Sequence, residues 1–534
     1  MKKTLKFSIL SLTILFSIIG FSQKPTIGLR FIDSNVTEGY TLFTPESINK
    51  VFLINNCGEI INEWEFTERP GATCYLLENG NLLRAGKESI EIRDWDNNIV
   101  WTFLMDSLGL NQHHDIEPMP NGNILCVITD LYPASDVVAI GRNPENLDEN
   151  FKLDKIIELQ PVGTNAANVI WEWKFIDHFI QDFDSSKLNY GNVANHPELI
   201  DINFDNGHNN DYTHVNAIDY NASLDQILIS TRHLDEIHII DHSTTTEEAK
   251  GSTGGNFNKG GDILWRWGNV EVYKHGTALD QKLYLQHDAK WVEDGYLDEG
   301  KITVFNNGGD GTDSFSSIHL LEPKILNNSY VIENEVFLPL NYEWSWNGLI
   351  LEEVVKEGKK SGAHALPNGN FIICETSKGQ VSEISRNGDV LWVYKNPVGV
   401  EVINQFEVSI GNNTNLFRAE KYSIGYVGFL GLDLTPKNII EDVNEISALC
   451  IENNTIEVVN EDVPVVSNPI KNGIMMFIQN ININSITISD STGRKVFEHD
   501  NFSGESLEIN LESGIYFVQF KIEGEIKNQK ILII

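Results

Sequence analysis

Four histidines occupy the same place in a repeated pattern, each just ahead of a short β-like run. They are His114, His214, His287 and His364. A single histidine beside a strand is usually a structural residue, but four at equivalent positions are hard to produce by chance. If the repeats are blades of one ring, the four side chains converge on one central hole. The pattern therefore predicts a site at that hole.

Other polar residues lie close to these histidines in the pattern. Asn216 is two residues after His214, and Arg232 follows one strand later. The planar guanidinium of Arg232 suits an anion, and the alternative is a surface ion pair with nearby Asp235. Arg418, in the sixth repeat, is a further candidate for the same hole.

This set of residues contains no serine nucleophile and no paired carboxylates. It suits transfer of a group that bears several anionic oxygens. A neutral imidazole is a competent nucleophile near neutral pH and accepts the group covalently. Arginine and asparagine bind the non-bridging oxygens in the transition state. A second imidazole protonates the leaving oxygen and then deprotonates the acceptor. Such chemistry needs neither a metal nor a cofactor.

Internal sequence repeats indicate the fold that must position these residues. Six units each contain a β-alternating run, a turn and a second run that carries tryptophan. The tryptophans are Trp64, Trp101, Trp171, Trp265, Trp344 and Trp392. Asn-Gly turns, as in ENGNLLRAG and PNGNFIICET, precede a further strand of the unit. We therefore predict an all-β fold, a six-bladed propeller of four-stranded blades. A solenoid is the alternative, but no capping segment is evident.

The units differ in length, so the insertions must be loops on one face. The largest run from Ile176 to Asn210 and from Ser243 to Asn258, and the first leads into His214. We expect this polar loop to form a mouth or lid over the hole. The segment from Lys24 to Lys50 is too short for a domain, so we expect it to supply an outer strand that closes the ring.

The two ends of the chain differ from the repeats. Residues 1–22 have lysines before an apolar run and small residues at its end, which is typical of a secretory signal peptide. Residues 23–438 make up the predicted propeller, and the acidic, Asn-rich stretch 439–462 is predicted to be a linker. Residues 463–534 alternate with frequent turn signals, which predicts a small β-sandwich.

Composition narrows the class of partner. The formal net charge is −37 with no basic stripe, which argues against nucleic acid. After residue 22 no segment reaches ~18 uninterrupted apolar residues, so no membrane span is expected.

Five cysteines leave at least one unpaired in an exported chain. Cys126 and Cys374 lie in apolar runs, where buried thiols are expected.

The QHDA motif at His287, the HVN motif at His214 with STR one strand later, and the HHD motif ending at Asp115 occur together with the tryptophan repeats. In this combination the chain resembles the bacterial arylsulfate sulfotransferase family, over roughly Gly39 to Thr435. The resemblance implies a six-bladed propeller that uses no nucleotide sulfate donor. It also implies that a sulfuryl group passes from a phenolic sulfate ester to another phenol by a ping-pong route through a sulfohistidine.

The same resemblance assigns roles to individual residues. His287 would be the nucleophile. His214, Asn216 and Arg232 would hold the sulfuryl oxygens, and His114 would assist in binding or proton transfer. The enzyme would then be a transferase of sulfur-containing groups, with an aryl sulfate donor and a phenol acceptor as its small-molecule partners.

Three residues are placed less firmly by this pattern. Strand alternation points His113 away from the hole, so we prefer His114. His364 matches only by its repeat position, and its role stays open. We group His364 and Arg418 with Asn216 as candidates for binding substrate.

The C-terminal stretch carries motifs of its own: NP, DSTGRKV, GIYFVQF and the final KNQKILII. It resembles the C-terminal sorting domain of the type IX secretion system. The resemblance implies a secreted or surface-bound protein that is exported through the periplasm and recognised by that machinery. A carbohydrate-binding or adhesive sandwich is the alternative.

Two other functions compete with sulfuryl transfer. One is a non-catalytic secreted propeller that acts as a ligand-binding or adhesion scaffold; the presence of His287, His214 and Arg232 together favours the enzyme. The other is a metal- or quinone-dependent oxidoreductase, because histidines from different blades can bind a metal. The vicinal cysteines typical of quinone dehydrogenases do not occur in the sequence.

Overall fold

The computed structural model describes residues 24–454, except 146, 209–210 and 408–412, together with most of 474–533. The predicted signal peptide, residues 1–22, lies outside the described residues, and so does the end of the predicted linker. The chain divides into two compact units, Met1–Cys450 and Ile451–Ile534. Within the described part, no helix is long and apolar enough to cross a membrane.

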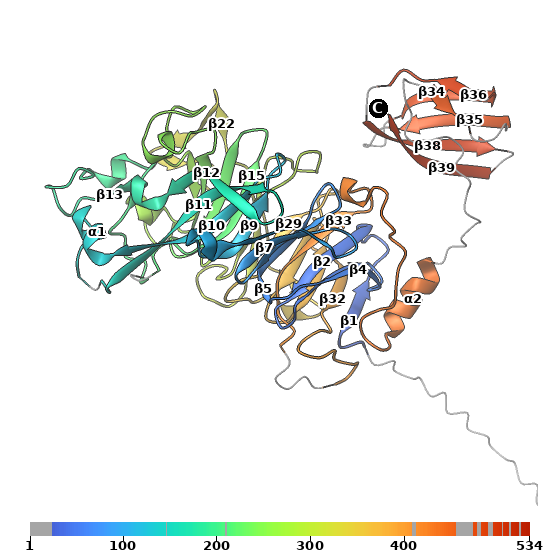
Figure 1. Cartoon of the computed structure of the whole chain (residues 1–534), viewed down its shortest axis with the longest axis horizontal. Helices are drawn as coiled ribbons and strands as arrows, with labels where there is room; N and C mark the ends of the chain where they lie inside the picture. Colours follow the sequence, from blue (N-terminus) through green and yellow to red (C-terminus); the bar gives the residue numbers. More distant parts are fainter. Residues whose placement is uncertain are drawn as a thin grey trace, which may run out of the picture. The chain divides into compact units, whose positions relative to one another are not determined.

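The larger unit contains six antiparallel sheets of four or five strands, the blades of a six-bladed β-propeller. Figure 1 labels strands of most of these sheets. From the innermost strand outward, blade 1 has β33 (Leu416–Ser423), β2 (Gly39–Pro45), β3 (Lys50–Asn55) and β4 (Ile60–Glu65). Blade 2 has β5 (Pro70–Leu76), β6 (Leu82–Gly86), β7 (Ser89–Arg93) and β8 (Ile99–Leu104). Blade 3 has β9 (Gln112–Pro118), β10 (Ile124–Pro133), β11 (Asn150–Val162) and β12 (Ala166–Lys174).

The remaining blades follow the same order. Blade 4 has β15 (Val215–Asn221), β16 (Gln226–Thr231), β17 (Glu236–Asp241) and β18 (Trp265–Trp267). Blade 5 has β19 (His287–Trp291), β20 (Ile302–Asn306), β21 (Ser317–Leu321) and β26 (Trp344–Trp346). Blade 6 has β29 (Gly362–Ala365), β30 (Phe371–Glu375), β31 (Gln380–Ile384), β32 (Val390–Lys395) and β1 (Gly28–Ile32). The short hairpins β22 (Ile325–Leu326) with β23 (Ser329–Tyr330), β24 (Ile332–Glu333) with β25 (Val336–Phe337), and β27 (Leu349–Ile350) with β28 (Glu353–Val354) decorate blade 5 and the start of blade 6.

The recurring tryptophan has a physical reason that the structure makes plain. It lies in the fourth strand of every blade, and its indole N–H donates a hydrogen bond to the next blade. Five of the acceptors are backbone carbonyls, the sixth is the Thr244 hydroxyl, and the bond from the last blade returns to blade 1. The pairs are Trp64–Asp94, Trp101–Ala166, Trp171–Thr244, Trp265–Leu338, Trp344–Arg386 and Trp392–Asn56. The repeat thus marks a ring of contacts between neighbouring blades, which a buried indole needs in order to satisfy its N–H.

Most of the apolar core also lies between blades rather than within them. One buried cluster joins blades 1 and 2, another blades 2 and 3, and others blades 4 and 5 and blades 5 and 6. Each sheet is therefore buried on both faces, which explains the nearly continuous apolar runs of β10 and β16. The predicted buried thiols Cys126 and Cys374 are confirmed, and Cys74 is a third.

Ring closure uses both ends of the propeller chain. Strand β1 pairs with β32 as an extra outer strand of blade 6, in agreement with the outer strand expected from the N-terminal segment. Closure itself takes place elsewhere, because β33 from the far end pairs with β2 and becomes the innermost strand of blade 1. A prediction from the N-terminal segment alone could not include this strand.

Helix α2 (Glu445–Asn454) corrects the predicted linker over residues 439–462. A disulfide joins Cys450 of this helix to Cys57 in the turn between β3 and β4. The Asn444 side chain donates to the carbonyls of Ile27 and Leu29 at the start of the propeller. The segment that contains Asn444 and Cys450, which lies inside the predicted linker, is therefore fastened to blade 1 and β1.

The insertions gather beside blades 3 and 4. Strands β10 and β11 extend past the end of β9 and carry helix α1 (Ala134–Ala139) at their tip. The segment between β12 and β15 contains β13 (Phe179–Ile180) and β14 (Ile200–Asp201), which pair in parallel. The expected loop from Ser243 to Asn258 joins β17 to β18.

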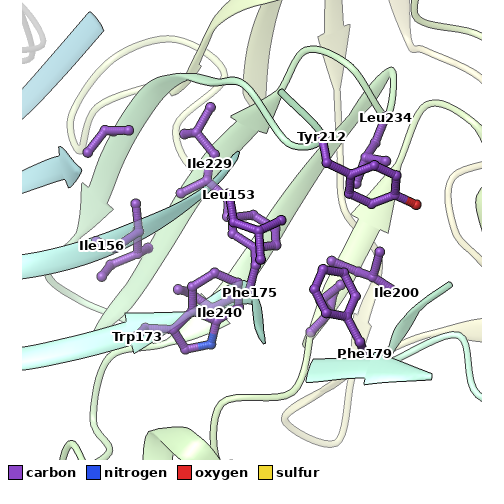
Figure 2. Packing of buried hydrophobic residues seen from close by; sticks show 14 of the residues in the cluster. Leu153, Ile156, Trp173, Phe175, Phe179, Ile200, Tyr212, Ile229, Leu234 and Ile240 are labelled. Carbon is purple, nitrogen blue, oxygen red and sulfur yellow. The ribbon is translucent and has the colours of Figure 1, made fainter. Parts of the chain in front are cut away.

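The segment between β12 and β15 is polar in sequence but has an apolar core. Figure 2 shows Phe179, Ile200 and Tyr212 of this segment packed together near Leu234. The same cluster continues into Leu153 and Ile229 of blades 3 and 4. The insertion is therefore built onto the propeller as a packed layer, which fixes the approach of the chain to His214.

The smaller unit is a separate β body. Its four-stranded sheet has the order β36 (Lys495–Ser503), β35 (Asn482–Ser489), β38 (Gly514–Ile522) and β39 (Glu525–Ile533). A second sheet pairs β34 (Ile474–Met476) with β37 (Ser506–Glu508). Met475, Ile486 and Phe520 belong to the core of this unit. The two sheets agree with the small β-sandwich expected there.

Candidate active site

The predicted histidines of blades 3, 4 and 5 lie at one end of neighbouring inner strands. His114 is in β9, His214 immediately precedes β15, and His287 begins β19. The pairing of all three strands shifts register near this end. His114 and His214 have φ of 58° and 49°, and Asp288 has φ of 53°. Such bulges and left-handed residues turn side chains out of regular alternation, and they gather at functional sites.

His114 lies between two other imidazoles. Its ring centroid is 4.8 Å from that of His214, and its Nδ1 is 2.6 Å from Nδ1 of His113. The expectation that His113 points away is therefore wrong, because the positive φ of His114 breaks strand alternation. His113 Nε2 bonds Asp154 Oδ1 at 2.9 Å. Burial, followed by the charges of His113, His214 and His287, holds the pKa of His114 well below its ordinary value.

His287 is buried and has both ring nitrogens engaged. Its Nδ1 lies 2.7 Å from Asn307 Oδ1 and 3.1 Å from the Leu285 carbonyl, and both of these are acceptors. Its Nε2 accepts the backbone N–H of Lys360 at 3.1 Å. The proton therefore resides on Nδ1 and the lone pair on Nε2. Burial outweighs the bond to Asn307 and, with the charge of Arg232, lowers the pKa of His287 to about 3.

Arg232 follows β16 directly and lies beside His214. Its backbone N–H donates to the His214 carbonyl at 3.1 Å, and its Nη1 donates to His233 Nε2 at 2.7 Å. His233 is oriented in turn by Nδ1, which donates to the Asp211 carbonyl. In the described part of the chain, Arg232 forms no ion pair with a carboxylate, Asp235 included. Its guanidinium is thus available to an anion.

Asn216 joins blades 4 and 5 beneath these groups. It is fully buried, and its Nδ2 donates to the carbonyl of Gln286, the residue before His287, at 2.7 Å. Gln286 Nε2 donates to the Glu236 carbonyl at 2.8 Å. The amide of Asn216 therefore fixes the chain that carries His287 and keeps a second N–H for another acceptor.

Arg418 lies one layer deeper in the ring. Its Nη1 donates to Asp115 Oδ2 at 2.6 Å, its Nη2 donates to the Asn216 carbonyl at 2.8 Å, and its Nε is 3.0 Å from Asp288 Oδ1. The side chain is 3% exposed, so these partners rather than solvent balance its charge. Arg418 thus connects Asp115 and Asp288, the residues that follow His114 and His287, with the backbone of Asn216.

His364 belongs to the same deeper layer. Its Nδ1 is 3.1 Å from Asp288 Oδ2, and its Nε2 lies 3.0 Å from the Ala419 carbonyl and 3.1 Å from Glu420 Oε2. The structure therefore does not bring His364 and Arg418 into the cluster of His114, His214 and His287.

We predict that His364 makes stability depend on pH. Burial lowers its pKa, but Glu420 and Asp288 outweigh burial and raise the pKa to about 10. Because the folded pKa exceeds the unfolded one, this stabilisation is complete below about pH 6.5 and is lost as pH rises toward 10. The thermal midpoint of His364→Gln should thus lie furthest below wild type at pH 6, and the gap should narrow toward pH 10. A gap that is constant with pH would contradict the buried ion pair.

One group of side chains has the composition of a metal site. Asp211, His214 and His233 each offer a ligand atom, and these atoms lie within 4.8 Å of one another. Two imidazoles and a carboxylate suit zinc. Arg232 Nη1, at 2.7 Å from His233 Nε2, places a positive charge on one of these ligands and opposes a second cation.

Several residues around the site escaped prediction. Asp211, His233, Asn307 and Lys360 all contact His214, Arg232 or His287, yet they lie in loops without repeat equivalents. The HNNDYTHVN stretch contains the only signal, an acid three residues before His214. Their positions depend on loop paths that strand patterns do not give.

Comparison with solved structures finds similar chains at low identity. A protein from Bacteroides caccae, described as of unknown function, is 14% identical with a TM-score of 0.39, covering 72% of this chain and 98% of that one. A streptogramin B lyase is 11% identical with a TM-score of 0.35, covering 75% and 94%. The β-propeller domain of Cps50 (Swd1) from Myceliophteria thermophila is 9% identical with a TM-score of 0.35, covering 70% and 90%. Among curated proteins, none matches the sequence.

Comparison with family models is more specific. The secretion system C-terminal sorting domain matches residues 466–534, in agreement with the sorting tail expected there. The arylsulfotransferase (ASST) model matches residues 75–397, which include His114, His214, Arg232 and His287. The match spans more than half of the chain, which therefore belongs to the arylsulfotransferase family.

Proposed function

We propose that this protein transfers a sulfuryl group from a phenolic sulfate ester to a phenol through a sulfohistidine at His287. Family membership supports aryl sulfotransferase activity in general. The observation that carries the finer proposal is the state of His287. It is a buried, neutral imidazole whose proton is held on Nδ1 by Asn307, so that the lone pair lies on Nε2, and the charge of Arg232 acts on the same ring.

In the first half-reaction, His287 Nε2 attacks the sulfur of the donor. The S–N bond forms as the bond between sulfur and the aryl oxygen breaks, and the electron pair stays on the phenolate oxygen. The sulfuryl group replaces the Lys360 N–H that occupies Nε2 in the free enzyme. In the second half-reaction, an acceptor phenol attacks the same sulfur and returns His287 to its starting state.

Arg232 and Asn216 are proposed to bind the sulfuryl oxygens. The guanidinium is free of carboxylate partners among the described residues, and the Asn216 amide has a second N–H to donate. Hydrogen-bond donors that are already in place around the sulfuryl oxygens stabilise the negative charge of the transition state, because the protein does not have to rearrange during the reaction. The Lys360 N–H, aimed at Nε2, is a further donor at the same place.

The two remaining histidines divide the other tasks. His114, whose low pKa keeps it neutral, is proposed to assist as a hydrogen-bonding group. His214 has an unengaged Nε2 among the described residues and is proposed to pass the proton to and from the phenol oxygens. In this proposed mechanism the side chains provide the nucleophile, the hydrogen-bond donors and the proton, and the donor ester provides the sulfuryl group. The mechanism therefore uses no nucleotide, metal or cofactor. His364 and Arg418 are proposed to support the site from below.

The test is hydrolysis and transfer with 4-nitrophenyl sulfate. Purified protein should release nitrophenolate, and added phenol should accelerate the release and yield phenyl sulfate. Ping-pong kinetics, with parallel double-reciprocal lines when donor and acceptor are varied, should accompany transfer. Inactivity with all aryl sulfates tested would instead favour the binding-scaffold function.

The sorting domain at residues 466–534 indicates export and a secreted or surface location. We propose that residues 1–22 direct passage into the periplasm and that the type IX machinery removes the C-terminal unit after the linker. The mature enzyme would then start near Gln23 and retain the disulfide-bonded Cys450. An intact mass that includes residues 1–22, measured on protein exported by the native host, would contradict this processing.

A further inference from the structure

Asp211 ends the insertion between β12 and β15 and contacts His214 directly. Its Oδ2 accepts a hydrogen bond from His214 Nδ1, and its Oδ1 is paired with Lys152 Nζ at 3.0 Å. The pairing to Nδ1 leaves Nε2 of His214 on the opposite side of the ring, where no hydrogen-bond partner occurs among the described residues. The contact thus sets both the tautomer and the direction of this imidazole.

The backbone around Asp211 is held from two sides. The Tyr212 N–H donates to the Lys152 carbonyl on extended strand β11, and Tyr212 Oη donates to the Asp201 carbonyl at 2.6 Å. Tyr212 packs in the apolar core of the insertion, beside Phe179 and Ile200 (Figure 2). The carboxylate is therefore presented by a rigid element rather than by a free loop.

The residues that flank His214 are fixed independently of Asp211. Asp154 Oδ2 accepts the Thr213 hydroxyl at 2.7 Å and the Val215 N–H at 2.6 Å. Loss of the Asp211 carboxylate would therefore leave the backbone of His214 in place. It would also leave the contact between His233 and Arg232 in place, because His233 bonds the carbonyl of residue 211 and not its side chain.

We propose that Asp211 is the positioning residue of proton transfer, holding His214 so that Nε2 serves the phenol oxygen. This rests on the proposed sulfuryl transfer. As the bond from sulfur to the aryl oxygen breaks, the phenolate oxygen takes the proton from Nε2 of the His214 imidazolium, and Nδ1–H stays bonded to Asp211. The acceptor phenol later returns a proton to Nε2, so that no proton is gained or lost over the cycle.

The variant Asp211→Asn tests this role, because it removes the charge but keeps the size of the side chain. We expect its kcat to fall by about 100-fold with phenyl sulfate, whose leaving phenolate is strongly basic and needs the proton. With 4-nitrophenyl sulfate, whose leaving phenolate is stable without a proton, we expect a loss of only about fivefold. A plot of log kcat against the pKa of the leaving phenol should therefore become steeper.

A matched control is Asp205→Asn in the same insertion. Asp205 is exposed, and its carboxylate accepts a hydrogen bond from the Gly207 N–H within its own loop. This variant should keep both rates within about twofold of wild type. Asp211→Glu, which restores the charge at a longer reach, should recover part of the rate with phenyl sulfate.

The outcomes separate the possible roles. Equal losses with both donors would show that Asp211 only supports the fold, and no loss would show that it does not act on His214; either overturns the proposal. Activity lost on treatment with EDTA, together with metal in wild type and none in Asp211→Asn, would instead assign Asp211, His214 and His233 to a metal site. Failure of the wild type to turn over either donor would refute the transferase function itself, independently of Asp211.

Discussion

Replacing His287 by alanine should lower kcat with 4-nitrophenyl sulfate by about 10⁴-fold or more, because it removes the atom that accepts the sulfuryl group. Among the described residues, no other histidine of the cluster has the partners that His287 has, Asn307 on Nδ1 and the Lys360 N–H on Nε2. His114 bonds His113, and His214 is directed by Asp211. Steady-state rates with and without phenol measure the loss, and both should vanish together.

The same experiment has a structural control. His287 is buried, and alanine would leave Asn307 and the Lys360 N–H without their partner, at a cost of about 1–3 kcal/mol for each unsatisfied group. Thermal midpoints should therefore be measured beside the rates, and His287→Asn offers a less disruptive replacement. His196→Ala, a histidine that pairs with Glu198 away from the site, should keep full activity.

Mass spectrometry locates the sulfuryl group directly. Wild-type enzyme quenched after mixing with donor alone should yield a peptide that contains His287 with one added sulfuryl group. His287→Asn should yield none. A sulfuryl group trapped on His114 or His214, or a fully active His287→Ala enzyme, would overturn the assignment.

Replacing Arg232 by alanine should cost about 3–4 kcal/mol of transition-state stabilisation, or roughly 10²–10³-fold in kcat. The guanidinium has His233 as a hydrogen-bond partner but no carboxylate partner among the described residues, so its charge is directed to the substrate. Arg232→Lys should recover only part of the loss, because an ammonium lacks the planar fork. Measurements of kcat and KM with 4-nitrophenyl sulfate would separate transition-state from ground-state binding.

Arg30 provides the control for Arg232. It lies in β1 on the outer edge of blade 6, where it donates to Gln380 Oε1 at 3.0 Å, so Arg30→Ala should leave the rates unchanged. If Arg232→Ala raised KM alone and left kcat unchanged, the guanidinium would bind the donor without stabilising the transition state.

The strand pattern could be predicted because each part of a blade has its own chemical marker. Asn-Gly turns start β6, β10 and β30, and a tryptophan marks the fourth strand of every blade. These tryptophans link neighbouring blades, so the same contact must recur around the ring. Strand β33 was not predicted as the closing strand, because it lies far from its partner β2 in sequence and has no turn that joins it to that strand.

The residues of the site could be predicted only where the position of a residue along its strand indicates how deep its side chain lies in the ring. His114, His214 and His287 share one level, whereas His364 lies deeper although it occupies a similar place in its repeat. The reason is that register shifts in β9, β15 and β19 displace the residues along these strands, so equal places in the repeats do not lie at equal depths. In blade 6, Gly362 lies directly against Asp288, where an added Cβ would be 2.0 Å from Oδ2, and His364 follows two residues further down.

The closure of blade 1 has a consequence for the order in which the protein is built. Its strands β2 to β4 come from the first part of the propeller to be synthesised, but its innermost strand β33 comes from the last. Until Leu416–Ser423 has been delivered, β2 presents an unpaired inner edge, which is a template for association with other chains. The bond between Cys57 and Cys450 likewise has to wait for residues that are 393 positions apart. Closure of the ring is therefore a late event, and the disulfide can form only after both cysteines have reached an oxidising compartment. A chain interrupted before β33 would have five complete blades and one open one.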